Sequence, residues 1–301
     1  MGRVPAGARL PPRQLMRRVG WVVGDERPAD VFEERGREQW ALIKSLLGAD
    51  RDLTGRRALD FGCGVGRILR PAAEADPECE LWGCDIDGPS IEWLRARCPT
   101  LELRRNGAWP PLDMPDGHFD LIWAFSVFTH LTDAWSAWIL ELHRLLKPGG
   151  RLIATVFGPG HANFVQEPVS EEIIGMNVLY PYAGWDTGGP LVLHSRWWIE
   201  AHWGRAFEIT DFRVGRQDGA PPLYGQSAVV MRRRPVAPTL AELERPQADE
   251  PREWAALRQD AGAHRRELIR LRRELDTVYN GHSWRLTAPL RALAERRRHR
   301  S

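Results

Sequence analysis

The stretch ALDFGCGVGRILR, residues 58–70, contains an apolar run that ends in Asp60, followed by three glycines at alternate positions. Glycine reaches backbone conformations that other residues avoid, so this spacing predicts a tight turn between a strand and a helix. A strand that passes through such a turn into a helix points backbone N–H groups and the positive helix end at a polar or anionic ligand. The stretch therefore predicts a ligand-binding loop.

Two classes of cofactor compete for a loop of this kind. A dinucleotide-binding loop has the pattern G-x-G-x-x-G, whose third glycine permits close packing of the helix on the strand. Here the glycines are Gly62, Gly64 and Gly66, and Arg67 occupies the position of that third glycine. The pattern therefore disfavours NAD.

Short apolar runs alternate with helical patterns along the chain around this loop. Strands that alternate with helices predict right-handed βαβ units and a parallel sheet. Further along, FEITDFRV and GQSAVVMRRR predict an antiparallel pair of strands at one edge of the sheet. The earlier strands that we expect are RALDFG, CELWGCDID, LELRRN, FDLIWAFSVF and RLIATVFG.

The pattern D-x-G-x-G-x-G, which begins at Asp60, resembles motif I of class I S-adenosylmethionine (SAM)-dependent methyltransferases, of the type 11/12 kind. LWGCDID, NGAWPPLDMPDGHFDLIWAFSVFTHL and LKPGGRLIATV are similar to later parts of that family in the same order, so the resemblance covers about residues 50–235. It implies an α/β fold, with a Rossmann-like, seven-stranded, mostly parallel sheet and helices on both faces. It also implies methyl transfer as the reaction (EC 2.1.1.-) and SAM as the cofactor.

The resemblance assigns roles around the cofactor. The carboxylate of Asp60 helps to hold the amino-acid end of SAM, Asp85 accepts both ribose hydroxyls, and Ile86 packs on the adenine. Asn106 stands where the family often has an acid that contacts the adenine amino group, and an amide oxygen can accept the same hydrogen bond. The implied cofactor-binding set is Asp60, Gly62, Cys63, Gly64, Gly66, Asp85, Ile86, Asn106, Gly107 and Phe125.

Histidines are the candidates for a general base. His130 directly follows the expected fourth strand, at the edge where open α/β sheets bind ligands, and an imidazole titrates near working pH. The alternative is a histidine that hydrogen-bonds a loop or caps the following helix. His194, after a long insertion, is the second candidate base, and His161 within the insertion is weaker. No cluster of acids and histidines has metal-ligand spacing, so we expect no metal.

The insertion covers residues 158–193 and interrupts the strand–helix alternation. A connection of that length in a compact domain usually forms a lid or a substrate-binding segment. Its aromatic residues Tyr180, Tyr182 and Trp185 suit either a wall that stacks on sugars or plain packing of the lid.

Composition describes a globular chain. Of its 301 residues 43% are hydrophobic and 27% are charged. It has no apolar run of about 18 residues and no hydrophobic leader, so we expect a cytoplasmic protein. The cysteines, which show neither CxxC spacing nor pairing with histidine, are expected to be small buried hydrophobes; they are Cys63, Cys79, Cys84 and Cys98.

The chain after the expected methyltransferase domain differs in character. Leu257, Ala261, His264, Leu268, Leu271, Leu275 and Val278 follow one another at intervals of four and three residues, which is typical of a coiled-coil seam. Self-association through 257–278 is one interpretation, and a lone surface helix is the other. The segments that we expect are a flexible arm (1–30), the methyltransferase domain (31–234), a Pro-rich linker (235–253), a coiled-coil helix (254–280) and a basic amphipathic tail (281–301).

The C-terminal region of the chain bears on the substrate and on the location of the protein. Residues 265–301 hold eleven arginines against four acids, although the whole chain has a net charge of only +2. NGHSWRLTAPLRAL resembles a segment that recurs after coiled coils in bacterial enzymes of surface-polysaccharide assembly, and LMRRVG and FSVFTHL resemble a methyltransferase subfamily of the same gene clusters. This resemblance implies O-methylation of a hydroxyl on a glycan or small molecule. The tail also suits peripheral contact with the inner membrane face.

Two other functions remain open from the sequence. One is a non-catalytic scaffold with a SAM-type fold that tethers partners through its coiled coil. The other is a membrane-surface or nucleic-acid adaptor driven by the basic tail, although no motif that reads nucleic acid accompanies the charge.

Overall fold

The computed structural model describes residues 10–18, 29–158, 170, 174–181, 184, 189–215, 222–281, 284, 286–287 and 291. The chain forms two compact units, residues 1–257 and residues 258–301. The predicted insertion and basic tail lie largely outside the described residues, as do His161, Tyr182 and Trp185.

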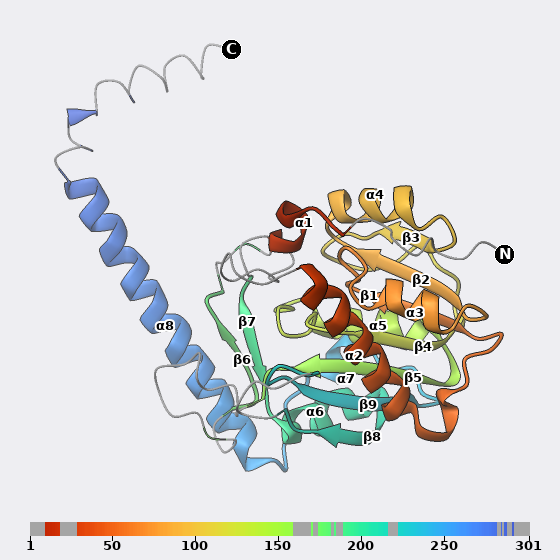
Figure 1. The fold of residues 1–301 in the computed structure, drawn as a ribbon. Helices are drawn as coiled ribbons and strands as arrows, with labels where there is room; N and C mark the ends of the chain where they lie inside the picture. Colours follow the sequence, from red (N-terminus) through yellow and green to blue (C-terminus); the bar gives the residue numbers. More distant parts are fainter. Residues whose placement is uncertain are drawn as a thin grey trace. The chain divides into compact units, whose positions relative to one another are not determined.

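A seven-stranded sheet forms the centre of the first unit (Figure 1). Its strand order is β3-β2-β1-β4-β5-β9-β8, and the first five strands are parallel. β9 runs antiparallel to β5 and β8, which confirms the predicted antiparallel pair and the mostly parallel sheet. The strands are β1 (Arg57–Phe61), β2 (Glu80–Asp85), β3 (Glu102–Arg105), β4 (Phe119–Ala124), β5 (Leu146–Val156), β8 (Phe207–Arg213) and β9 (Ser227–Arg233).

Helices cover both faces of the sheet because successive strand residues point to opposite sides. Ala58 packs in the cluster with α2, α3 and α4, whereas its neighbour Leu59 packs in the cluster with α5, α6 and α7. In Figure 1, α2 crosses in front of the strands. The helices are α2 (Ala29–Leu47), α3 (Leu69–Ala75), α4 (Gly88–Arg97), α5 (Trp135–Leu145), α6 (Arg196–His202) and α7 (Leu240–Glu244), with 3-10 turns at Gly48–Arg51 and Trp203–Arg205.

The structure adds elements that the sequence pattern did not indicate. The N-terminal segment predicted as an arm contains α1 (Arg13–Arg18), and Met16 is buried beside Phe32 and Val65. Within the insertion, β6 (Met176–Leu179) and β7 (Leu191–His194) form an antiparallel pair. The predicted linker contains α7, whose Leu243 is fully buried.

The predicted coiled-coil segment forms one helix, α8 (Pro251–Asn280), which begins before the expected residue 254. In the part of the chain that the structure describes, no helix has the length and apolarity needed to cross a membrane. The four cysteines are free and buried, as expected.

Candidate functional site

The glycine loop leaves β1 at the carboxyl edge of the sheet and leads into α3. Gly62, Gly64 and Gly66 all have positive φ angles, of 83°, 52° and 77°. A Cβ on Gly62 would lie 2.3 Å from Cγ2 of Val127, so the loop also requires the absence of a side chain there. The N–H groups of Gly62 and Cys63 donate to the carbonyl of Cys84, at 2.8 and 3.0 Å, and tie the loop to β2.

Asp85 ends β2 with its carboxylate against this loop. Oδ2 accepts from the N–H of Gly64 at 2.6 Å, and Oδ1 accepts from the N–H of Asp87 at 2.8 Å. Burial raises the pKa of Asp85, and these two backbone hydrogen bonds oppose that rise. Because a carboxylate has about four lone-pair sites, both oxygens retain capacity for the two ribose hydroxyls.

Asp60 is a second buried acid beside the loop. Burial raises its pKa to about 8, the charge of Asp85 adds to the rise, and the charge of Arg67 opposes it. Two buried carboxyl groups with one arginine nearby leave an environment that favours a cationic ligand. SAM carries a sulfonium and an ammonium group, so its charge fits this part of the loop.

The end of β3 presents an unpaired acceptor. The N–H of Asn106 donates to the carbonyl of Asp85 at 3.1 Å, and its side-chain nitrogen donates to the carbonyl of Gly107 at 2.8 Å. Its Oδ1 is buried and has no hydrogen-bond partner among the described residues. An orphaned buried acceptor costs free energy until a donor reaches it, and the adenine amino group is such a donor.

The two apolar members of the implied cofactor set differ in exposure. Ile86, directly after β2, is half-buried, as contact with an adenine face requires. Phe125, directly after β4, is 6% exposed and packs in the core cluster on the α2 face. The structure thus brings the loop, Asp85, Ile86 and Asn106 to one edge of the sheet, and their contacts with SAM stay predictions.

His130 lies in the turn after β4, at the same edge. Its Nδ1 is 2.8 Å from the carbonyl oxygen of Pro190. A carbonyl only accepts, so Nδ1 carries the proton and Nε2 keeps its lone pair. Burial lowers the pKa of His130, so the ring stays neutral at pH 7. A neutral imidazole with a lone pair on Nε2 has the form that a general base needs, and this role stays a prediction.

His194 occupies a different environment at the end of β7. Its side chain is fully buried, with the ring centroid 5.6 Å from that of Trp198 and 5.5 Å from that of Trp203. Burial lowers its pKa to about 3, so the ring is neutral. Both histidines adjoin Phe157, because the N–H of His194 donates to its carbonyl and the ring of His130 stands edge-on to its ring. His130 reaches the open edge, whereas His194 lies in the core.

Sequence reasoning missed a polar cluster where β4 and β5 end and β9 begins. Ser126, two residues after the end of β4, has a φ of 60°, and its N–H donates to Oγ1 of Thr155 at 2.7 Å. The side-chain nitrogen of Gln226 donates to Oγ of Ser126 at 2.8 Å. Gln226 reaches this edge because antiparallel β9 starts where β5 ends, with Ser227 opposite Val156. No local signal links residues 100 positions apart.

A second missed contact joins the loop before β9 to α2. The guanidinium of Arg35 lies 4.2 Å from the ring centroid of Tyr224, and the Tyr224 hydroxyl donates to Glu38 at 3.3 Å. Burial raises the pKa of Tyr224 to about 12, so its hydroxyl stays a donor. Burial lowers the pKa of Arg67, and the nearby carboxyl group of Asp60 opposes that shift, so Arg67 shares the electrostatic environment of the glycine loop. No group of side chains in the described ranges has the composition of a metal site.

Comparisons with known proteins agree with this geometry. A family model described as a methyltransferase domain matches residues 59–152. A probable SAM-dependent methyltransferase of Mycolicibacterium smegmatis is 32% identical over 111 residues, which is 35% of this chain and 42% of that protein. The 27-O-demethylrifamycin SV methyltransferase of Amycolatopsis mediterranei is 31% identical over 116 residues, 37% of this chain and 42% of that protein.

A third relative has a different acceptor. The tRNA U34 carboxymethyltransferase of Syntrophotalea carbinolica is 34% identical over 136 residues, 42% of this chain and 38% of that protein. The chain spans about two fifths of the length of these three relatives. Residues 59–152 thus match a methyltransferase domain, and the ordered glycine loop and the acids at the strand ends support SAM as its cofactor.

Proposed function

We propose that this protein is a SAM-dependent methyltransferase that methylates an oxygen, on a hydroxyl of a glycan or small molecule, with His130 as general base. The observation that carries the proposal is the hydrogen bond from His130 Nδ1 to the carbonyl of Pro190. It fixes the tautomer in which Nε2 accepts a proton, at the sheet edge where this domain class binds its substrates.

Different residues of this chain bind the methyl donor and activate the methyl acceptor. When bound, SAM supplies a methyl group that is activated by its sulfonium. Asp60, Asp85 and Asn106 hold and orient the cofactor at the ends of β1, β2 and β3. His130 accepts the hydroxyl proton on Nε2, which leaves the acceptor oxygen nucleophilic as it is methylated. The low pKa of His130 keeps it unprotonated before each turnover.

The glycan acceptor has narrower support. It rests on the resemblance of residues 280–293 to a segment found in polysaccharide-assembly enzymes, and on Tyr180, which is 53% exposed at the end of β6 and can stack on a sugar. The basic, amphipathic composition of 281–301 supports peripheral contact at the inner membrane face of a cytoplasmic protein. The non-catalytic scaffold and the adaptor gain no support, since the relatives named above are all named as transferases.

The test is a turnover screen with SAM against sugar nucleotides and lipid-linked glycans, with His130→Ala alongside. We expect His130→Ala to lower kcat by about 10²- to 10⁴-fold, because a positioned general base contributes about that much. The dissociation constant for SAM, measured by calorimetry, should not change.

The matched control is His118→Ala, which alters a half-buried histidine at the opposite end of β4. Undiminished turnover in His130→Ala would remove this residue as base. Absence of any heat with micromolar SAM would overturn the methyltransferase proposal itself.

A further inference from the structure

From Leu257 onward, α8 carries a row of exposed apolar side chains. Leu257, Leu268, Leu275 and Val278 are 45–54% exposed. Isolated exposed leucines are ordinary, but large apolar residues in a continuous row on one helix indicate a surface that another helix covers. In the described part of residues 258–301, no element packs on this row.

The spacing of the row fixes a heptad register. With Leu257 at position d, positions a are Ala261, Leu268 and Leu275, and the later d positions are His264, Leu271 and Val278. The flanks of the row then separate by charge. Position e is Arg258, Arg265 and Arg272 in turn, and position g is Asp260, Glu267 and Glu274.

We propose that α8 forms a parallel, in-register, two-stranded coiled coil with a second copy of this chain. In a parallel pair, each g residue faces the e residue that lies five positions later on the other helix. Asp260 therefore meets Arg265 of the second copy, and Glu267 meets Arg272. In an antiparallel pair, g faces g and e faces e, so acids would oppose acids and arginines would oppose arginines.

The charged residues at positions e and g also determine how many helices form the coiled coil. Only positions a and d are apolar along most of the seam, which is the narrow stripe that two helices need. Bundles of three or four helices bury more of the e and g flanks, and burial of unpaired arginine is costly. The single polar residue in the seam, His264, sits at the same level in both helices only when they are in register.

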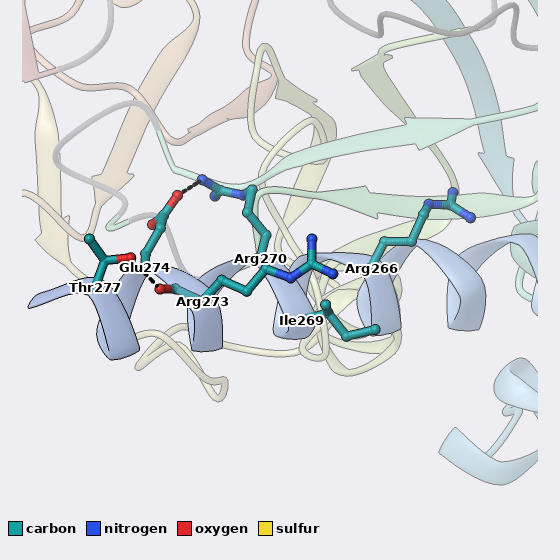
Figure 2. Close-up of a pocket in the computed structure, with 6 residues that line it drawn as sticks. All are labelled: Arg266, Ile269, Arg270, Arg273, Glu274 and Thr277. Atoms are coloured by element: carbon teal, nitrogen blue, oxygen red, sulfur yellow. Dashed lines mark hydrogen bonds and ion pairs between the residues drawn. The ribbon is translucent and has the colours of Figure 1, made fainter. Parts of the chain in front are cut away.

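The opposite face of α8 is polar and takes no part in the seam. Figure 2 shows a hollow there that is lined by Arg266, Ile269, Arg270, Arg273, Glu274 and Thr277. These residues occupy positions b, c and f, apart from Glu274 at g. Arg270 donates to Glu267 at 2.8 Å and to Glu274 at 2.5 Å within the same helix. These pairs stabilise the helix and keep its outer surface soluble.

A cysteine at the end of the seam tests orientation in the full-length chain. Val278→Cys places the new thiol opposite its own copy in a parallel pair, but opposite the start of the seam in an antiparallel pair. The four native cysteines are buried, so the added thiol is the accessible one. We expect oxidised glutathione to yield a covalent dimer with Val278→Cys and not with the outer-face control Thr277→Cys.

Sedimentation of the unmodified chain tests stoichiometry. A dimer that dissociates on dilution supports the proposal. A monomer up to about 100 μM, a trimer, a tetramer, or a dimer without the Val278→Cys cross-link would overturn it.

A charge swap tests the pairing itself. Glu267→Arg should raise the dimer dissociation constant by roughly tenfold, because it sets an arginine against Arg272 of the second copy. The double change Glu267→Arg/Arg272→Glu should restore most of the affinity, and the outer-face change Arg273→Glu should leave it unaltered. Circular dichroism checks that α8 stays helical in each variant. Failure of the double change to recover affinity would refute the g-to-e pairing.

Discussion

The carboxyl edge of the sheet has two halves that are built in different ways. The cofactor half, at the ends of β1, β2 and β3, consists of residues close in sequence whose backbone groups hold one another, as Gly64 and Asp87 hold Asp85. The half that we propose for the acceptor (the acceptor half), where β4 and β5 end and β9 begins, joins residues that are distant in the sequence: Gln226 donates to Ser126, and His130 donates to the carbonyl of Pro190. The proposed donor site thus lies within one continuous segment, residues 60–107, whereas the proposed acceptor site depends on contacts between distant parts of the chain. The four predictions below test this division.

Gly62→Ala should have the largest effect on the cofactor half. The new Cβ would meet Val127 at 2.3 Å and would force a side chain into a φ of 83°, which together cost about 3 kcal/mol of folding free energy. We expect SAM binding to be lost in calorimetry and the thermal midpoint to fall. Gly48→Ala is the control, because its φ is 57° but its Cβ would meet nothing within 4 Å, so it should cost only about 1 kcal/mol. Equal effects of the two changes would contradict the packing argument.

Asp85→Asn should weaken SAM binding by about 100-fold. The change removes the charge from two hydrogen bonds to ribose and weakens the tie to Gly64, each worth about 1.5 kcal/mol or more. Glu80→Gln, at the opposite and exposed end of β2, should leave SAM binding unaltered. If turnover at saturating SAM fell while the affinity for SAM stayed intact, Asp85 would not be a cofactor-binding residue.

The raised pKa of Asp60 predicts pH-dependent SAM affinity. Below its pKa of about 8 the carboxyl is mainly protonated, and a cationic ligand must displace that proton. Affinity should therefore rise by up to about 50-fold between pH 6 and pH 8, with proton release detectable by calorimetry in buffers of different ionisation enthalpy. In Asp60→Asn this dependence should disappear. A persistent slope in that variant would assign the titration to another group.

Gln226→Ala should have the smallest effect, and only on the acceptor half. Loss of its hydrogen bond to Ser126 loosens the ends of β4 and β9, so turnover should fall by about fivefold while the dissociation constant for SAM stays the same. Gln259→Ala, on the outer face of α8, is the control. A matching loss of SAM affinity would break the division between the halves.

The parts of the structure that follow from local sequence patterns could be predicted from the sequence. Alternating apolar runs predicted the parallel sheet, and the spacing of Gly62, Gly64 and Gly66 predicted a loop whose φ angles are all positive. The pattern also placed Asp85 at the end of β2 and Asn106 directly after β3, and parallel strands end at the same edge of a sheet.

The placement of the two histidines and the nature of the segment around α7 depend on tertiary contacts, which local sequence patterns do not reveal. His130 and His194 look alike in sequence, and only packing by Trp198 and Trp203 places one in the core. Proline and acidic residues around α7 suggested a linker, although Leu243 is fully buried there. One local signal was available, since Thr239 and Glu242 form a capping box at the start of α7.

The hydrogen bond that sets the tautomer of His130 is donated by its Nδ1–H and accepted by a main-chain carbonyl, that of Pro190, directly before β7. Any amino acid at position 190 supplies the same carbonyl, provided that the backbone keeps its path. A side-chain change at position 190 should therefore leave the tautomer of His130 unaltered.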